Sequence, residues 1–253
     1  MIEVKELYKY FGENKAVNDL SFEVKDGEIY GLIGPNGSGK STTMEIISGI
    51  IKPTKGEVLV NNIDVINNSN DVKKILGYVP ESPVLYESLT PIELFNFIGG
   101  LRNIQDEKLI KRVNYFIKAF DLEKYLDQYI GTLSFGTKQK VSIITAFLHN
   151  PNILIMDEAM NGLDPKVARI LREILLQFKN KGKNMIFSTH VLPLAEMICD
   201  RVGVIFNGKI IAEGTIQELK EKSQEGNLED IFLKLTRSQD EVYDVVKALQ
   251  EAD

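Results

Sequence analysis

The residues best suited to chemistry lie in one glycine-rich stretch, which runs from Gly34 to Thr42 and reads GPNGSGKST. A glycine, four residues, Gly-Lys and then a serine or threonine is the spacing of a phosphate-binding loop. Glycines let backbone N–H groups approach a phosphate without a Cβ in the way, and a following helix N-terminus adds partial positive charge. Lys40 would bridge the outer phosphates of a nucleotide, and the Ser41 hydroxyl would hold Mg²⁺. The nucleotide-binding residues predicted from this pattern are Gly34, Pro35, Asn36, Gly37, Ser38, Gly39, Lys40, Ser41 and Thr42.

Two further polar clusters follow apolar, strand-like runs. Asp157 and Glu158 come directly after ILIM, and the Ser188-Thr189-His190 segment follows MIF. Ligands of open α/β sheets bind beyond the carboxyl ends of the strands, so we expect both clusters to meet the phosphate loop. There Asp157 would reach Mg²⁺, Glu158 would take a proton from an attacking water, and the third cluster would offer a donor to the γ-phosphate. Alone, an acidic pair is often a helix cap and a lone histidine is often structural, but convergence with the loop favours the functional interpretation.

The surrounding chain supplies the strand and helix that such a loop requires. Residues 28–33 predict a strand before the loop, residues 41–48 predict a helix after it, and the Asp26-Gly27 pair predicts a hairpin turn before that strand. Further strands are predicted at residues 1–5, 21–25, 56–60, 76–79, 153–156, 184–189, 202–206 and 209–212. Further helices are predicted at residues 94–101, 106–120, 136–149 and 165–179.

These elements predict an α/β fold with a parallel sheet, an N-terminal antiparallel β layer and an inserted α-helical subdomain. Residues 1–87 and 151–215 are expected to form the α/β core. Residues 88–150 are expected to form the helical insertion, which opens on the capping box Thr90-Pro91-Ile92-Glu93. Residues 216–253 are expected to form a charged helical tail.

Composition narrows the classes of function. The chain has 253 residues, a net charge of −6 and 43% hydrophobic residues, so it carries no electrostatic footprint for nucleic acid. No apolar run approaches the roughly 20 residues of a membrane helix, and the first residues do not resemble a signal peptide. We therefore expect a cytosolic protein that reaches a membrane only through a partner. The single cysteine, Cys199, excludes an internal disulfide and is expected to be buried.

Several residues keep two interpretations at this stage. A ring among the three aromatics of LYKYFG, which are Tyr8, Tyr10 and Phe11, would either stack on a nucleobase or fill a gap beneath the β layer. Asp164 before Pro165 reads as a helix cap, with any further role open. Ser134 and Gly136, in LSFGT, begin a helix whose free N-terminus is also an anion site with no defined target.

Taken together, the motifs resemble those of the ATP-binding subunits of ABC transporters. GPNGSGKST resembles the Walker A motif, ILIMDE the Walker B motif, NGLD the D-loop, STH the switch histidine and LSFGT the signature motif of the family. This resemblance implies a P-loop NTPase core of the RecA type that hydrolyses ATP with Mg²⁺. It also implies a head-to-tail dimer, a homodimer or a pair of ATPase subunits, in which Ser134 and Gly136 contact the ATP held by the partner chain. It makes Glu158, His190 and Lys40 catalytic and Phe11 the adenine-stacking ring.

The sequence departs from the family pattern in two places. Phe135 and Thr137 stand where the family usually has glycine and glutamine, although the serine and second glycine remain. Glu81 stands where the family usually has the glutamine that senses Mg²⁺ and the membrane partner. A glutamate there would add negative charge near the metal and would either tighten Mg²⁺ binding or oppose the γ-phosphate. Both departures resemble Ecs-type and related subunits that pair with export-type permeases.

The resemblance implies a subunit that closes around two ATP and drives an integral membrane permease from the cytoplasmic face, and export is the direction that it favours. In this family the permease selects the substrate. The alternatives are a non-transport ABC ATPase that acts on a soluble partner, and a regulatory nucleotide-binding module without turnover. Glu158 argues against the second, because a pure binder has no need of a general base. A GTPase is disfavoured because no Asn-Lys-x-Asp segment is present to read guanine.

Overall fold

The computed structural model describes residues 1–236, and the remainder of the expected tail, residues 237–253, lies outside the described part. The strands are β1 (Ile2–Phe11), β2 (Asn14–Val24), β3 (Ile29–Ile33), β4 (Lys55–Val60), β5 (Ile63–Asp64), β6 (Leu76–Val79), β7 (Ile153–Asp157), β8 (Asn184–Thr189), β9 (Arg201–Phe206) and β10 (Lys209–Thr215). The helices are α1 (Lys40–Ile47), α2 (Ser69–Ile75), α3 (Pro91–Leu101), α4 (Asp106–Ala119), α5 (Phe135–Phe147), α6 (Pro165–Asn180), α7 (Leu192–Ile198), α8 (Ile216–Ser223) and α9 (Leu228–Thr236). Two short 3₁₀ helices are η1 (Glu123–Tyr125) and η2 (Ile130–Thr132).

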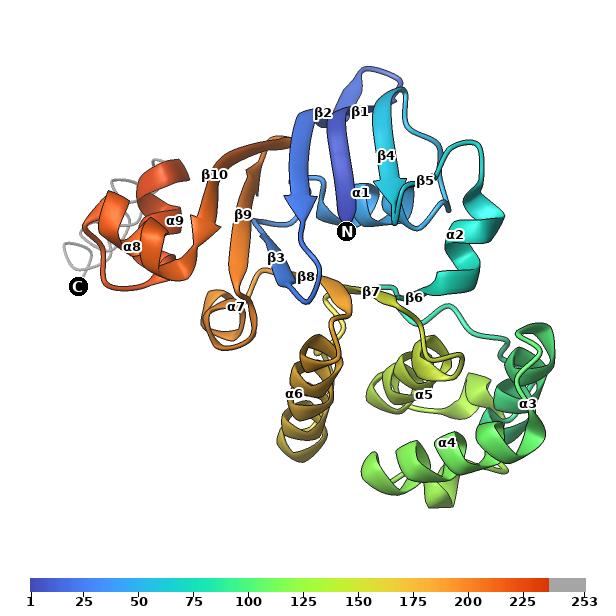
Figure 1. Ribbon diagram of the computed structural model, residues 1–253. Helices are drawn as coiled ribbons and strands as arrows, with labels where there is room; N and C mark the ends of the chain where they lie inside the picture. The colour runs from blue at the N-terminus through green and yellow to red at the C-terminus, as the bar shows by residue number, and fades with distance from the viewer. Residues whose placement is uncertain (237–253) are drawn as a thin grey trace.

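Two sheets form the centre of the molecule (Figure 1). The antiparallel sheet has the order β2-β1-β4-β5, and the second sheet has the order β10-β9-β3-β8-β7-β6. In the second sheet the neighbouring pairs among β9, β3, β8, β7 and β6 are parallel, whereas β10 runs antiparallel to β9. Both the parallel sheet and the N-terminal antiparallel layer predicted from the sequence are confirmed.

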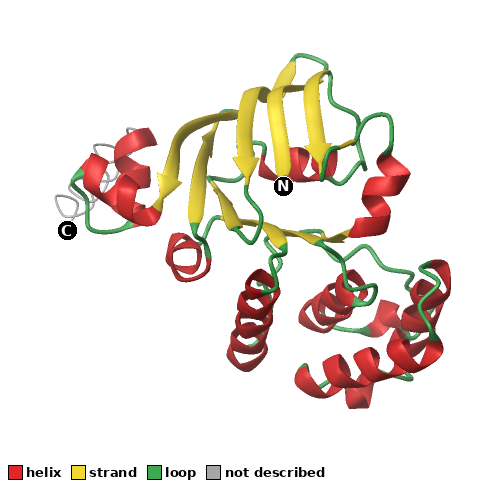
Figure 2. Ribbon diagram, in the orientation of Figure 1, coloured by secondary structure: helices red, strands yellow, loops and turns green. Residues whose placement is uncertain are grey.

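The second sheet buries both of its faces. Successive side chains of a strand point to opposite faces. Thus Tyr30 and Leu32 of β3 pack with the antiparallel sheet and α1, whereas Ile29 and Ile33 pack with the helices on the other face. Figure 2 shows α1 between the two sheets and α5 and α6 below the second one. Every residue of β3, β7 and β8 is buried, which explains why these strands read as continuous apolar runs.

The span predicted to be all-helical, residues 88–150, contains α3, α4, η1, η2 and α5 and no strand. The capping box is confirmed, since the Thr90 side chain accepts from the Glu93 backbone N–H and the Glu93 carboxylate accepts from the Thr90 backbone N–H. Beyond β10, α8 and α9 agree with a helical tail as far as Thr236. Within residues 1–236, no helix is long and apolar enough to cross a membrane.

The predicted hairpin at Asp26-Gly27 is wrong. This turn joins β2 of the antiparallel sheet to β3 of the parallel sheet, and those two strands do not pair. The Asn184 side chain holds the turn by accepting from the Gly27 N–H (3.0 Å) and donating to Asp26 (2.9 Å). The true hairpin joins β1 and β2 around Gly12, whose φ is +60°. The strands predicted at residues 1–5 and 21–25 are correspondingly longer, and Phe11 is the last residue of β1.

Candidate functional site

The glycine-rich loop occupies the carboxyl end of β3 and leads directly into α1. Its backbone is packed so closely that side chains are excluded at two positions. A Cβ on Gly34 would lie 2.2 Å from the Ile205 carbonyl oxygen, and one on Gly39 would lie 2.4 Å from the Ala16 carbonyl oxygen. Gly39 also has a φ of +107°, a conformation that glycine adopts readily. The two glycines of the motif are therefore required by both space and backbone geometry.

Lys40 is the first residue of α1, and its amine lies inside the loop. The side chain is buried, and Nζ donates to the carbonyl oxygens of Gly34 (2.8 Å) and Pro35 (3.1 Å). Burial lowers the pKa of Lys40, and the carboxylates of Glu158, Asp157 and Glu81, in that order, act against this shift. The buried amine therefore experiences the negative charge of all three carboxylates.

Asp157 ends β7 beside the loop. Its side chain is 1% exposed, and burial raises the pKa of this carboxyl, while hydrogen bonds from Ser188 and Ser41 act to lower it. Asp157 and Ser41 thus present oxygen atoms, from two neighbouring elements, that are the ligands Mg²⁺ prefers. A buried carboxylate that burial disfavours in its charged form would be stabilised by a cation, so these residues fit the expected metal.

Glu158 follows immediately and has an unusual backbone conformation for a non-glycine residue, with φ of +47°. The Ser188 carbonyl and hydroxyl oxygens both accept from its N–H, at 3.3 and 3.1 Å. Glu158 Oε1 lies 2.9 Å from Nδ1 of His190 and 3.7 Å from Nζ of Lys40. Its other oxygen, Oε2, is buried without a hydrogen-bond partner among the described residues. One carboxylate oxygen is thus free to accept a proton or a hydrogen bond.

The aromatic ring predicted to stack on a base is at the edge of this site. Phe11 is 52% exposed, which is inconsistent with a ring that fills a gap beneath the β layer. It pairs with Asn14 across the β1–β2 turn, and Ala16 of the same hairpin contacts Gly39. Nζ of Lys9 lies 4.9 Å from the centre of the Phe11 ring. The hairpin therefore carries an exposed ring next to the phosphate loop.

The signature residues do not join the phosphate loop of their own chain. Within residues 1–236, no hydrogen bond links the Ser134 side chain to that loop; Ser134 caps α5, and Gly136 in its first turn lies against Gly162. A Cβ on Gly136 would lie 2.3 Å from the Gly162 carbonyl oxygen. Asp164 caps α6 by accepting from the Val167 N–H (2.9 Å), which confirms its capping role.

Sequence reasoning missed two residues that organise this region, Gln139 and Lys140, and did not predict the contacts of a third, Ser188. The Ser188 hydroxyl bridges Asp157 and Glu158, as described above, although the segment that contains it was singled out. Gln139 is fully buried on α5 and donates to the Ala159 carbonyl oxygen at 3.0 Å. Lys140 forms an ion pair with Asp164 at 2.8 Å. Gln139 lies between two lysines in the sequence of α5, so nothing in the sequence indicated that it would be buried.

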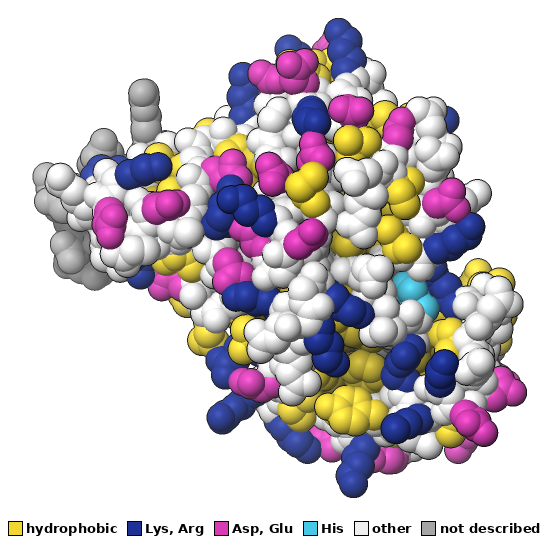
Figure 3. Space-filling view, in the orientation of Figure 1, with side chains coloured by type: hydrophobic (Ala, Val, Ile, Leu, Met, Phe, Trp, Pro, Cys, Tyr) yellow, Lys and Arg dark blue, Asp and Glu magenta, His cyan; other side chains and the backbone are white. Residues whose placement is uncertain are grey.

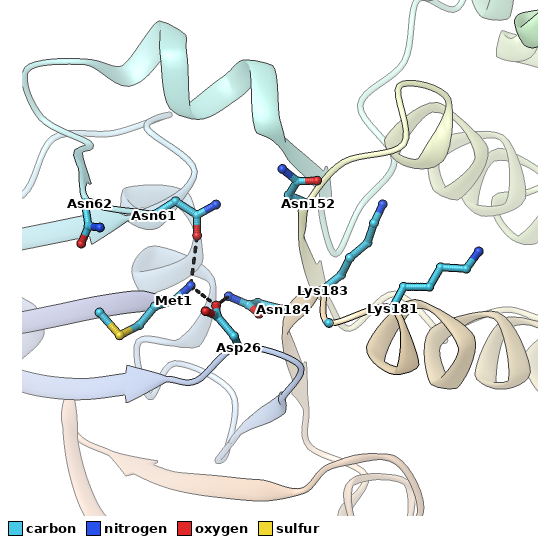
Figure 4. A pocket seen from close by; sticks show the side chains of 9 residues that line it. Met1, Asp26, Asn61, Asn62, Asn152, Lys181, Lys183 and Asn184 are labelled. Atoms are coloured by element: carbon cyan, nitrogen blue, oxygen red, sulfur yellow. Dashed lines mark hydrogen bonds and ion pairs between the residues drawn. The ribbon is translucent and has the colours of Figure 1, made fainter.

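Other cavities lie away from the loop. One of about 530 Å³ lies at the amino ends of β7 and β8, the edge opposite the phosphate loop, and Figure 4 shows Asn152, Lys181 and Lys183 around it. A second, of about 350 Å³, lies between α4 and α6 and is lined by Arg112 and both lysines. Figure 3 shows lysine and arginine side chains around hydrophobic side chains in the lower part of the view. Arg112 donates to the carbonyl of Leu148, the C-cap of α5, and Lys183 donates to the carbonyls of Asn150 and Pro151 between α5 and β7, so both cations have structural roles.

The strand, loop and helix around Lys40, with the acidic pair at the end of a neighbouring parallel strand, define a P-loop nucleoside triphosphatase. Residues 17–161 match the family described as ABC transporter. An ABC transporter ATP-binding protein of Methanocaldococcus jannaschii is 38% identical over 221 residues, which cover 87% of this chain and 80% of that protein. EcsA of Bacillus subtilis, an ABC-type transporter ATP-binding protein, is 36% identical over 94% of this chain and 97% of its own. The chain belongs to the ABC transporter ATP-binding family and is an ATPase.

Solved structures give the same assignment. The ATP-binding subunit of an ABC transporter superposes with a TM-score of 0.88 at 33% identity, over 93% of this chain and 99% of that structure. A dimeric ATP-binding cassette in a post-hydrolysis state, bound to ADP and Pi, superposes with a TM-score of 0.77 at 28% identity, over 85% of this chain and 98% of that one. The predicted fold class is thereby confirmed.

Proposed function

We propose that this chain is the energising subunit of an ABC transporter, and that two copies close head to tail around two ATP molecules. The observation that carries the proposal is the separation of the site into two halves. The phosphate loop lies at the carboxyl edge of the parallel sheet, whereas the exposed Ser134 caps α5, and within residues 1–236 its side chain has hydrogen bonds to Thr137 and none to that loop. A second copy supplies the missing half. A dimeric arrangement in a cassette of the same fold supports this proposal.

Within each half, we assign roles from position and charge. Backbone N–H groups of the loop and the amine of Lys40 bind the phosphates, and Phe11 stacks on adenine. Ser41 and Asp157 would hold Mg²⁺, which neutralises phosphate charge when bound. Glu158 takes the proton of the attacking water, for which it has a buried free oxygen.

The other site residues act around this centre. His190, whose ring bonds Glu158, contacts the γ-phosphate and orients the base. Ser134 and Gly136 bind the γ-phosphate of the ATP held by the partner. Asp164 places the D-loop at the dimer interface. Glu81 is exposed after β6, and its charge acts on Lys40, so it lies near enough to sense the metal.

We assign the permease contact to the exposed apolar surface around α3. Tyr86 and Phe97 are 59% and 44% exposed, and their rings meet edge to face at 5.6 Å. A cavity of about 270 Å³ nearby is lined by Ile50, Ile98 and other residues of α2, β6, α3 and α5. Exposed apolar side chains grouped in this way indicate a surface that a partner covers. This surface lies between the helical span of residues 88–150 and strand β6, which precedes Glu81. Closure of the nucleotide site would therefore move this surface.

Export is the direction that the relatives favour. A probable multidrug ABC transporter ATP-binding protein of Escherichia coli, YbhF, is 34% identical over 95% of this chain, which covers 42% of that relative. Because multidrug transport removes compounds from the cell, we propose an export-type permease as the partner, with this chain at the cytoplasmic face of the cell membrane.

The experiment is a pull-down of tagged Glu158→Gln protein with ATP from detergent-solubilised membranes of the host. We expect a protein with several membrane spans to co-purify in a stoichiometric amount. The Lys40→Ala variant, treated in the same way, controls for nucleotide-independent capture. Recovery of soluble proteins alone would contradict the transport assignment and favour an ABC ATPase that acts on a soluble partner.

A further inference from the structure

The cap of α5 differs from two other helix caps in this chain. Helices α3 and α8 both begin with a threonine cap and a glutamate at the third helical position, and each glutamate accepts from the backbone N–H of the cap residue. Helix α5 begins with Ser134, and its third helical position is Thr137. A threonine side chain is too short to complete a capping box. The hydroxyl of Thr137 therefore has another partner.

That partner is the Ser134 side chain. Oγ1 of Thr137 lies 2.9 Å from Oγ of Ser134, and the Thr137 backbone N–H also donates to this oxygen at 3.4 Å. Thr137 is 7% exposed, so its hydroxyl is shielded from solvent, whereas Ser134 is exposed. Within residues 1–236 the Thr137 hydroxyl has no other hydrogen-bond partner.

The difference in burial sets the direction of the hydrogen bond between the two hydroxyls. Each hydroxyl has one proton to donate and two lone pairs to accept with. If Ser134 donated, the buried Thr137 proton would have no acceptor, and an unsatisfied buried donor is costly. Thr137 is therefore the donor. The Ser134 oxygen then accepts two hydrogen bonds, one from the N–H and one from the O–H of Thr137, which occupy both of its lone pairs. The Ser134 hydroxyl can form one further hydrogen bond, in which it donates its own proton outward.

We propose that Thr137 is a positioning residue that holds the Ser134 hydroxyl as an outward donor to the γ-phosphate of the partner's ATP. The inference rests on the proposed head-to-tail dimer. An anion accepts hydrogen bonds, so a hydroxyl restricted to donation is preorganised for it. Thr137, one of the two unusual residues of LSFGT, thus positions Ser134, the serine that the motif retains.

The other unusual residue fixes the same loop from the opposite side. A Cβ on Gly162 would lie 2.7 Å from Cδ1 of the Phe135 ring, so ring and glycine backbone are in close contact. Because Phe135 and Gly136 both rest on Gly162, the backbone that carries Ser134 has little freedom to shift. The remaining freedom is rotation of the Ser134 hydroxyl, which Thr137 restricts.

The test measures ATP-dependent dimerisation of the full chain in the Glu158→Gln background by analytical ultracentrifugation. Thr137→Val replaces the hydroxyl with a methyl group of similar shape. Each dimer contains two copies of the contact, so we expect its Kd to rise on the order of tenfold. Thr137→Ser keeps the hydroxyl and is expected to restore the Kd to within about twofold of the parent. ATP binding to the monomer should not change, since the phosphate loop is untouched.

A double-mutant cycle separates positioning from a purely structural role. In a Ser134→Ala background, adding Thr137→Val should have no further effect on the dimer Kd. A further loss of similar size there would assign Thr137 a structural role and overturn the inference. Thermal unfolding checks that each variant folds, and Thr137→Ala serves in place of Thr137→Val if that variant does not.

The two proposals fail in different ways. If the Glu158→Gln parent does not dimerise with ATP, the head-to-tail arrangement is wrong and the role of Thr137 falls with it. If the parent dimerises and Thr137→Val does so with an unchanged Kd, only the role of Thr137 is overturned.

Discussion

Replacement of Glu158 by glutamine removes a proton acceptor and changes little else. The two side chains have nearly the same shape, and the site is 4% exposed, so neighbouring atoms keep their packing. Oε1 of Glu158 bonds His190 at 2.9 Å, and an amide oxygen can occupy the same place. The second carboxylate oxygen, which has no hydrogen-bond partner within residues 1–236, becomes an amide nitrogen or remains an acceptor without basicity.

The size of the expected loss in ATP turnover follows from the role of Glu158 as a general base. Proton transfer by a positioned side chain contributes on the order of 10² to 10⁴ in rate, or about 2.7 to 5.4 kcal/mol of barrier. We therefore expect ATP turnover to fall by roughly that factor. ATP affinity should be unchanged or higher. The negative charge 3.7 Å from Nζ of Lys40 is removed, and the amine is freer to bind phosphate.

Phosphate release under saturating ATP measures the rate, and equilibrium titration with ATP measures the affinity. Glu45→Gln is the matched control, because Glu45 is a partly buried carboxylate on α1 whose pKa is raised by burial and then by Asp157. It removes a charge near the phosphates without removing the proposed base, so turnover should stay within about threefold. A Glu158→Gln protein that turns over within about threefold of the parent would refute the assignment of the base.

Three further predictions concern binding, packing and pH. Lys40→Ala should weaken ATP binding at least about tenfold in a titration, and an unchanged Kd would count against the loop assignment. In α3, Gly99→Ala should lower the free energy of unfolding by about 1–3 kcal/mol, because its Cβ would lie 2.2 Å from Cδ2 of the buried Leu109. Gly100→Ala has open space and should raise that free energy by about 0.5–1 kcal/mol; denaturant unfolding distinguishes the two, and equal effects would contradict the packing argument. Burial lowers the pKa of His149 to about 4, so the unfolded chain binds an extra proton between about pH 6.5 and pH 4. The contribution of the neutral His149 ring to the free energy of unfolding is fully present above pH 6.5 and should fall by about 1–3 kcal/mol as the pH falls toward 4. A His149→Gln variant whose stability had the same pH dependence would exclude this residue as the cause.

The phosphate loop was predictable because its determinants are local. Two glycines, a lysine and a serine specify backbone geometry and ligand chemistry within nine residues, and the apolar runs on either side identify strand and helix. The meeting of Asp157 and His190 with this loop followed from one general rule, that parallel strands place their carboxyl ends at one edge. Neither inference required knowledge of a particular side-chain contact.

The errors come from contacts between distant parts of the chain. Asp26-Gly27 correctly marks a turn, but a turn sequence does not specify which strands pair across it. Here β2 pairs with β1 in one sheet and β3 pairs with β8 and β9 in the other, and Asn184, far away in the chain, bonds the turn between them. Helix α2 and strand β5 have 7 and 2 residues, too short to produce a periodic signal. The hydroxyl pair of Ser134 and Thr137 is close in sequence, yet only burial of one member shows which is the donor.

The backbone of Glu158 connects the fold to the chemistry. A positive φ costs a non-glycine residue roughly 1–2 kcal/mol, so its occurrence needs a compensating cause. Ser188 supplies that cause: its carbonyl and hydroxyl oxygens both accept from the Glu158 N–H, and its hydroxyl also bonds Asp157. One residue of β8 thus fixes the two acidic side chains that follow β7. The strained turn redirects the chain so that the Glu158 carboxylate faces Lys40 and His190, whereas a continued strand would point it toward the face of the sheet opposite Asp157.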